Sequence, residues 1–243
     1  MGEASRNSWN YLPILLGPIL LYVFGYRFIY KLALVSKKQN ITTISDFISS
    51  RYGKRQTVAL MVTLIALLAT IPYIALQLKS IGSAFIILAE HVNPQMVIFL
   101  AAISIAIFSI IFGTKHTDIT EYRRGLMLAI AFESTIKLGA LVVVAVLGYL
   151  LWQQQTVSGP SLFSSFTSHE ALSIFQTTSF WGQTLMAAAA VICLPRQFHV
   201  AIVDNLSLAH LKTARWVFPS YLCITAITIP IIAVSGQSLL GQT

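Results

Sequence analysis

Long apolar runs alternate with short polar connections along this chain. Six of these runs are about as long as the roughly 20 residues that a helix needs to cross a bilayer core about 30 Å thick. We therefore predict six membrane-spanning helices, at Tyr11–Val35, Thr57–Leu78, Gln95–Phe112, Arg124–Trp152, Phe180–Val203 and Trp216–Val234.

Composition supports a membrane location. The chain is 56% hydrophobic and only 10% charged, whereas a soluble domain carries about 25% charged residues. We therefore expect an all-α integral membrane protein in contact with the lipid bilayer.

The distribution of the basic residues argues against nucleic acid as a partner and predicts a topology. The formal net charge is +8, yet all 16 Lys and Arg except Arg6, Lys79 and Lys137 lie in or beside alternate connections. Basic connections face the cytoplasm. The pattern therefore predicts an external N-terminus, in a bacterial-type inner (plasma) membrane.

Residues 40–55 are too polar to span a membrane and predict a short interfacial helix. Thr43 with Asp46 three residues later is a typical helix start, and Gly53 is a typical stop. Ile44 and Phe47 would share one apolar face at the cytoplasmic interface. Contact with lipid headgroups is the simplest role for such a helix.

The second predicted span carries a proline and a polar stripe. Pro72 removes a backbone hydrogen bond, and a break of this kind persists in membranes only where neighbours or a cavity compensate for it. Tyr73, Gln77 and Ser80 are spaced four and three apart, so they share one helix face. This face either lines a substrate path or forms hydrogen bonds between helices.

The fourth predicted span has charged residues at its start and in its interior. Asp118 and Glu121 fit a helix N-terminus, where carboxylates interact well with exposed N–H groups. Glu133 and Lys137 stand at positions i and i+4 and predict an intramembrane ion pair. The pair either neutralises itself against a neighbouring helix or takes part in coupling or gating.

The fifth predicted span is interrupted near its cytoplasmic end. Pro195 is followed closely by Arg196, Gln197 and His199. Secondary transporters build their binding sites from discontinuous helices of this kind; the alternative is an ordinary helix end. Cys193 and Cys223 fall in apolar spans, so we expect packing rather than a disulfide or a metal site.

No motif of a soluble enzyme occurs in the sequence. It has no phosphate-binding glycine-rich loop, no HExxH and no GxSxG. We therefore predict a chain without a catalytic domain, a metal site or an organic cofactor.

Five stretches together resemble the sodium/solute symporter family, and most closely its CbrA-type members fused to sensor histidine kinases. The stretches, in chain order, are YLPILLGPILLYVFGYRF, KKQNITTISDFISSRYGK, LIALLATIPYIALQLKSI, FGTKHTDITEYRRGLMLAIAFESTIKL and LPRQFHVAIVDNLSLAHLKTARWVFPSYL. They cover most of the chain, and their common order makes the resemblance specific.

The resemblance implies a partial LeuT-like bundle of inverted repeats. The six spans would be its second to seventh core helices, so residues 1–243 would form one transmembrane domain truncated at both ends. Sodium is the implied coupling ion. The resemblance implies a cation-pathway role for Asp118, and the substrate-path candidates are Tyr73, Gln77, Pro195, Gln197 and His199.

The implied function is sodium-coupled uptake or sensing of a small organic solute. In the kinase-fused members this solute would be an amino acid, with histidine as the specific expectation, and cytoplasmic kinase modules would be partners. Two alternatives remain: a sensory and anchoring membrane module without transport, and a plain symporter without a kinase.

Overall fold

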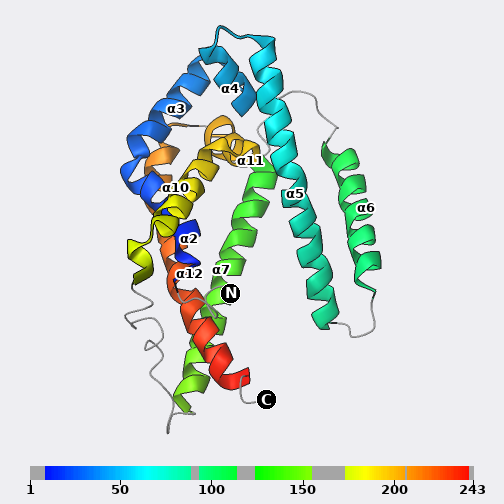
Figure 1. The fold of residues 1–243 in the computed structure, drawn as a ribbon, viewed down its shortest axis with the longest axis vertical. Helices are drawn as coiled ribbons and strands as arrows, with labels where there is room; N and C mark the ends of the chain where they lie inside the picture. Colours follow the sequence, from blue (N-terminus) through cyan, green and yellow to red (C-terminus); the bar gives the residue numbers. More distant parts are fainter. Residues whose placement is uncertain (1–8, 89–92, 114–123, 155–172, 206, 241–243) are drawn as a thin grey trace. The chain divides into compact units, whose positions relative to one another are not determined.

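The computed structural model describes residues 9–88, 93–113, 124–154, 173–205 and 207–240, and every regular element within them is helical (Figure 1). The predicted all-α membrane class is therefore confirmed. The elements are α2 (Leu12–Phe24), α3 (Tyr26–Lys38), α4 (Ile44–Arg51), α5 (Gln56–Leu88), α6 (Pro94–Gly113), α7 (Arg124–Gln154), η1 (Ile174–Gln176), α10 (Thr178–Cys193), α11 (Pro195–Phe198), η2 (His199–Val203) and α12 (His210–Leu240).

Four of these helices, α5, α6, α7 and α12, are long and apolar enough to cross a membrane singly. Up to six spans result if two bent helix pairs each count as one. The pair α2 and α3 bends by 75°, and α10 with the α11–η2 segment bends by 59°. The prediction of one straight span at Tyr11–Val35 is therefore wrong in shape, whereas the predicted interruption of Phe180–Val203 at Pro195 is confirmed.

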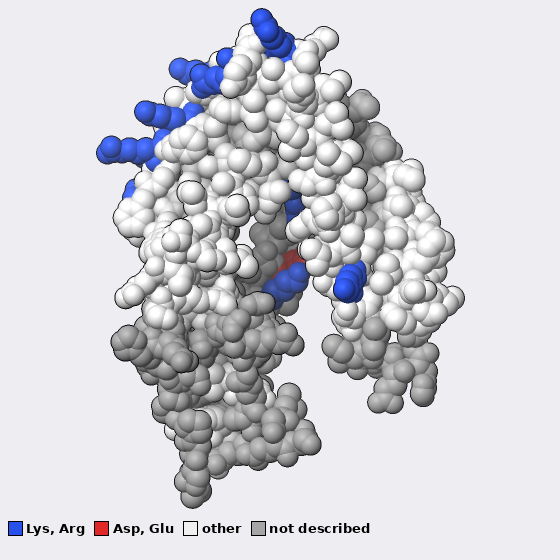
Figure 2. All heavy atoms as spheres, viewed as in Figure 1, with Lys and Arg blue, Asp and Glu red and all other residues white. Residues whose placement is uncertain are grey.

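Helix α3 departs furthest from the expected apolar span. Its buried residues, Ile29, Leu32, Ala33 and Ser36, follow a spacing of three and four, while Arg27 and Lys31 are exposed. Figure 2 shows basic side chains standing out from this helix. A helix with one apolar face and one basic face is typical of a membrane interface. Helix α2 alone is about 20 Å long, which is shorter than the bilayer core.

Helix α5 is one uninterrupted helix of 33 residues with Pro72 inside it. At 1.5 Å per residue it is roughly 50 Å long, so it exceeds the thickness of the bilayer core. The break that we expected at Pro72 is absent.

The chain divides into two compact units: residues Met1–Asn40 with Arg123–Thr243, and residues Ile41–Tyr122. In the first unit, α2 packs against both α10 and α12, and α12 also packs against α7. In the second unit, α5 packs against α4 and α6.

The predicted short helix is present as α4 in the second unit. The Thr43 side chain accepts a hydrogen bond from the Asp46 backbone N–H at 3.0 Å. The helix ends before Gly53, whose φ of +68° is unfavourable for residues with a Cβ. A hydrogen bond of 3.0 Å from the Thr63 hydroxyl to the Ser45 hydroxyl joins α4 to α5.

The two cysteines differ from the expectation. Cys193 and Cys223 are both free, and both are exposed. The expected packing role is therefore not seen within the described residues, where both thiols lie on helix surfaces.

The backbones of α2 and α10 approach each other very closely in the first unit. A Cβ placed on Gly17 would lie 2.5 Å from the Thr184 carbonyl oxygen and 2.7 Å from the Ala188 backbone nitrogen. Both atoms belong to the backbone, so rotation of a side chain cannot relieve the overlap. Small residues allow helices in membranes to approach this closely.

We predict that Gly17→Ala separates α2 from α10 and destabilises the protein. Overpacking of this kind costs about 1–3 kcal/mol, and each kcal/mol lowers the Tm by about 2–4 °C in a chain of this size. Thermal unfolding followed by tryptophan fluorescence measures the change.

Gly182→Ala on α10 is the matched control, because a Cβ there meets nothing within 4 Å. Alanine favours a helix over glycine by up to about 1 kcal/mol, so the control should keep or raise the Tm. Equal losses from the two variants would contradict the packing argument.

Candidate functional site

The break between α10 and α11 follows directly from the sequence. A residue before proline is disfavoured in helical geometry, and Leu194 accordingly has extended dihedrals of φ −72° and ψ 127°. Pro195 then occupies the first position of α11, where its missing N–H costs no helical hydrogen bond. The break therefore gives the chain a new direction at Pro195.

The segment after α11 widens into a π-helix, η2, at His199–Val203. The backbone N–H of Asp204 donates to the His199 carbonyl at 2.9 Å. The side chains of the same two residues approach to 3.5 Å, and they form an ion pair when His199 is protonated. Short π-helical turns are frequent at functional sites.

The two bent helix pairs contact each other along both of their halves. Helix α2 packs against α10, and α3 packs against η2. The buried side chains in the second contact region include Phe198 and Ile202, which are 1% and 3% exposed. Ser36 on α3 is also buried, and its hydroxyl has no hydrogen-bond partner among the described residues.

Arg215 of α12 holds the bend between α2 and α3. Its Nη2 donates a hydrogen bond of 3.0 Å to the Val23 carbonyl, in the last turn of α2. Its guanidinium also lies 5.1 Å from the ring centre of Tyr26, the first residue of α3. Arg215 therefore contacts both sides of the bend, through one charge-assisted hydrogen bond and one cation–π contact.

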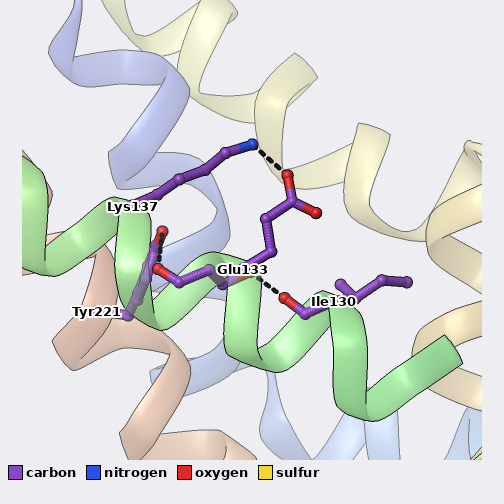
Figure 3. A network of polar contacts seen from close by, with 5 residues as sticks. Ile130, Glu133, Lys137 and Tyr221 are labelled. Atoms are coloured by element: carbon purple, nitrogen blue, oxygen red, sulfur yellow. Dashed lines mark hydrogen bonds and ion pairs between the residues drawn. The ribbon is translucent and has the colours of Figure 1, made fainter. Parts of the chain in front are cut away.

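The predicted ion pair on α7 is present (Figure 3). Lys137 Nζ lies 2.5 Å from Glu133 Oε1, and the two side chains are 71% and 60% exposed. The neighbouring turn is connected to α12, because the Tyr221 hydroxyl donates to the Ser134 carbonyl at 3.5 Å.

The structure brings some of the predicted site residues together and leaves others apart. Pro195, Gln197 and His199 share the α11–η2 segment, where Gln197 is exposed and His199 is half-buried. Tyr73 and Gln77 are exposed on α5 in the second unit, and within the described residues neither forms a hydrogen bond to another helix. Asp118 lies outside the described residues.

Three site features escaped prediction from the sequence. They are the bend at Gly25, the contact of Arg215 with that bend, and the π-helix that pairs His199 with Asp204. The cluster of basic residues just after Gly25 is the signal that could have revealed the first of them, because such residues are unusual within a continuous span.

No cluster of three or more His, Cys, Asp or Glu side chains in the described part of the chain could hold a metal ion. The polar groups at the bends are instead backbone carbonyls, hydroxyls and single charges. Such groups suit a small solute or a monovalent cation on a path between helices.

Comparison with known proteins identifies the family. The sequence model of the Sodium:solute symporter family matches residues 4–237. This match covers nearly the whole sequence, so the chain belongs to the sodium:solute symporter family. No solved structure matches it significantly.

Two curated relatives come from Bacillus subtilis (strain 168). The uncharacterized symporter YodF is 29% identical over 103 residues, which is 42% of this chain and 21% of the relative. The uncharacterized symporter YhjB is 28% identical over 98 residues, 39% of this chain and 19% of the relative. The matched part therefore spans about a fifth of each relative's length.

We predict that Arg215→Ala loosens the bend between α2 and α3. The Val23 carbonyl would lose its charged donor, at a cost of about 1–3 kcal/mol, and the Tm should fall accordingly. Lys212→Ala is the matched control, because Lys212 is an exposed cation on the same helix. Equal Tm changes in the two variants would show that the Val23 contact contributes nothing.

The ion pair on α7 generates a second prediction. Lys137→Met leaves the Glu133 carboxylate without its partner inside an apolar span, so the yield of folded protein in membranes should fall by roughly tenfold. The double variant Glu133→Gln with Lys137→Met removes both charges and should recover most of that yield. Fluorescence-detected size-exclusion chromatography measures the yield of folded protein for each variant. No recovery in the double variant would exclude charge imbalance as the cause.

Proposed function

We propose that this protein couples the entry of sodium to the uptake of a small organic solute across a membrane. The carrying observation is the family match over residues 4–237. The bent helices support the proposal, because transporters place substrate and ion sites where spans are discontinuous. In this proposal the protein is a transporter rather than an enzyme, and sodium is its only inorganic requirement.

The proposed path of the solute follows the α11–η2 segment. Pro195 frees backbone groups at the break, while Gln197 and His199 supply polar side chains beside it. Tyr73 and Gln77 of α5 are retained as proposed solute contacts. Asp118 is proposed to bind or guide the cation, in addition to capping the helix that follows it.

The proposed orientation places the N-terminus outside a bacterial inner membrane. The support is the concentration of basic residues in alternate connections, including the exposed Arg27, Lys31 and Lys38 of α3.

The proposed substrate class is an amino acid, with histidine as the first compound to test. The support is the resemblance of five ordered stretches to CbrA-type proteins, in which such a domain is joined to a sensor histidine kinase. The same resemblance favours a second role, in which the domain senses the solute and passes a signal to cytoplasmic kinase modules. A plain symporter would transport the solute without passing a signal to a kinase.

Uptake into proteoliposomes tests the transport proposal. An inward sodium gradient should raise the initial rate of radiolabelled histidine uptake, and an equal potassium gradient should not. Asp118→Asn should raise the sodium concentration for half-maximal uptake by roughly tenfold, as for the loss of about 1.4 kcal/mol of cation binding.

Asp46→Asn is the matched control, because it neutralises a carboxylate on the interfacial helix α4 and should leave the sodium dependence unchanged. Histidine uptake that ignores sodium would refute the coupling. An absence of uptake, combined with histidine-dependent autophosphorylation of the protein at its full natural length, would favour the sensory role.

A further inference from the structure

Helix α3 turns away from α2 where the chain has crossed only part of a bilayer. Helix α2 packs against α12, which is long enough to span a membrane, so we place α2 in the bilayer core. Its length of about 20 Å is less than the roughly 30 Å of that core. The bend of 75° then turns α3 toward the bilayer surface.

Helix α3 carries basic side chains on the side that the protein leaves uncovered. Arg27, Lys31 and Lys38 are exposed, and their spacing of four and seven residues places them on one face of the helix, the α3 basic face. The opposite side holds buried residues such as Ile29 and Leu32, and α3 packs against α2 and η2. Figure 2 shows the basic side chains projecting outward.

The charges of the α3 basic face have no partner in the part of the chain that the structure describes. Residues 12–45 contain no Asp or Glu, and no described carboxylate forms an ion pair with Arg27, Lys31 or Lys38. Arg27 is also the second residue of α3, where the positive end of the helix macrodipole disfavours a cation. An anion outside the described residues would therefore stabilise this face.

Two exposed aromatic rings beside Arg27 indicate what kind of anion fits. Phe24, at the end of α2, is 79% exposed, and Phe28 of α3 is 54% exposed. The boundary between lipid headgroups and acyl chains accepts apolar rings and basic side chains together. A soluble anion would neutralise the charges but leave both rings in water. The combination favours a lipid surface.

We propose that the α3 basic face binds the headgroups of anionic phospholipids in the adjacent leaflet, and that this contact holds α3 against the membrane beyond the bend. The proposal goes beyond the transport function and does not depend on it. Basic side chains near an anionic membrane surface are attracted to it, and salt screens the attraction. Phosphatidylcholine offers a similar boundary without net charge, so it is the reference lipid.

Backbone hydrogen–deuterium exchange tests this proposal. The protein at its full natural length is reconstituted in nanodiscs of phosphatidylcholine, with or without phosphatidylglycerol, and mass spectrometry reports exchange in α3. Phosphatidylglycerol should slow this exchange by roughly tenfold, as expected for one or two basic residues held near an anionic surface. Helix α6 contains no basic residue and should be unaffected. Equal rates in α3 with the two lipid compositions would overturn the proposal.

Two soluble anions separate a lipid surface from other partners. Glycerol phosphate, which is the phosphatidylglycerol headgroup in soluble form, should protect α3 far less when added to phosphatidylcholine nanodiscs, and so should poly-L-glutamate. Protection by glycerol phosphate equal to that by the lipid would assign the face to a soluble anion. The same result with poly-L-glutamate would assign it to an acidic protein partner. Either result overturns the lipid assignment.

A neutralising variant connects the protection to the α3 basic face. Arg27→Gln with Lys31→Gln removes two of its charges and should abolish most of the slowing by phosphatidylglycerol. Lys79→Gln with Lys212→Gln is the matched control, because it removes two exposed cations from α5 and α12 and should keep the slowing. Full slowing in the α3 variant would also overturn the proposal.

A charge-conserving variant covers the case in which the neutral variant fails to insert into the membrane. Arg27→Lys with Lys31→Arg keeps both charges and should retain the slowing, because attraction to an anionic surface depends on charge rather than on donor geometry. High salt should reduce the slowing in this variant and in the unchanged protein alike. Loss of the slowing on exchanging the two residues, or its persistence at high salt, would contradict binding to a charged lipid surface.

Discussion

The close approach of α2 and α10 at Gly17 is the constraint on which the first unit depends. A Cβ at this position would lie 2.5 Å from the Thr184 carbonyl oxygen, so only hydrogen fits there. With these two backbones in contact, α2 lies between α10 on one side and α12 on another. The continuations of the two helices then meet as well, since α3 packs against η2. One small residue therefore decides whether two bent helices can pack along both of their halves.

The polar groups of the candidate site depend on that packing in different ways. His199 and Asp204 are held by the local π-turn, so their pairing needs no distant contact. The contact of Arg215 with Val23 is a tertiary effect, because it requires α12 to lie against α2.

The sequence was most informative where structure is local. Four predicted features are decided by residues close together in the chain. They are the cap at Thr43, the end of α4 before Gly53, the Leu194–Pro195 break and the Glu133–Lys137 pair. Prediction failed where distant contacts decide: apolar content alone suggested one straight span across Gly25. The prediction of a break at Pro72 also failed, because the long helix α5 continues through this proline. The placement of Arg215 against Val23 joins residues 192 positions apart, and no short-range pattern contains it.

The two bends consequently differ in what maintains them. The α10–α11 bend has a local contribution, since proline lacks a donor and disfavours helical geometry at Leu194, which is extended. No proline stands at the α2–α3 bend, and Gly25 there has ordinary dihedrals of φ −84° and ψ 8°. Glycine is needed there for space: a Cβ would lie 2.6 Å from the Leu21 carbonyl oxygen. Gly25 therefore permits the α2–α3 bend, and Arg215 of α12 stabilises it. A rearrangement that moved α12 away from α2 would therefore release the first bend while leaving the second intact, so the two halves of the site respond unequally to the same motion.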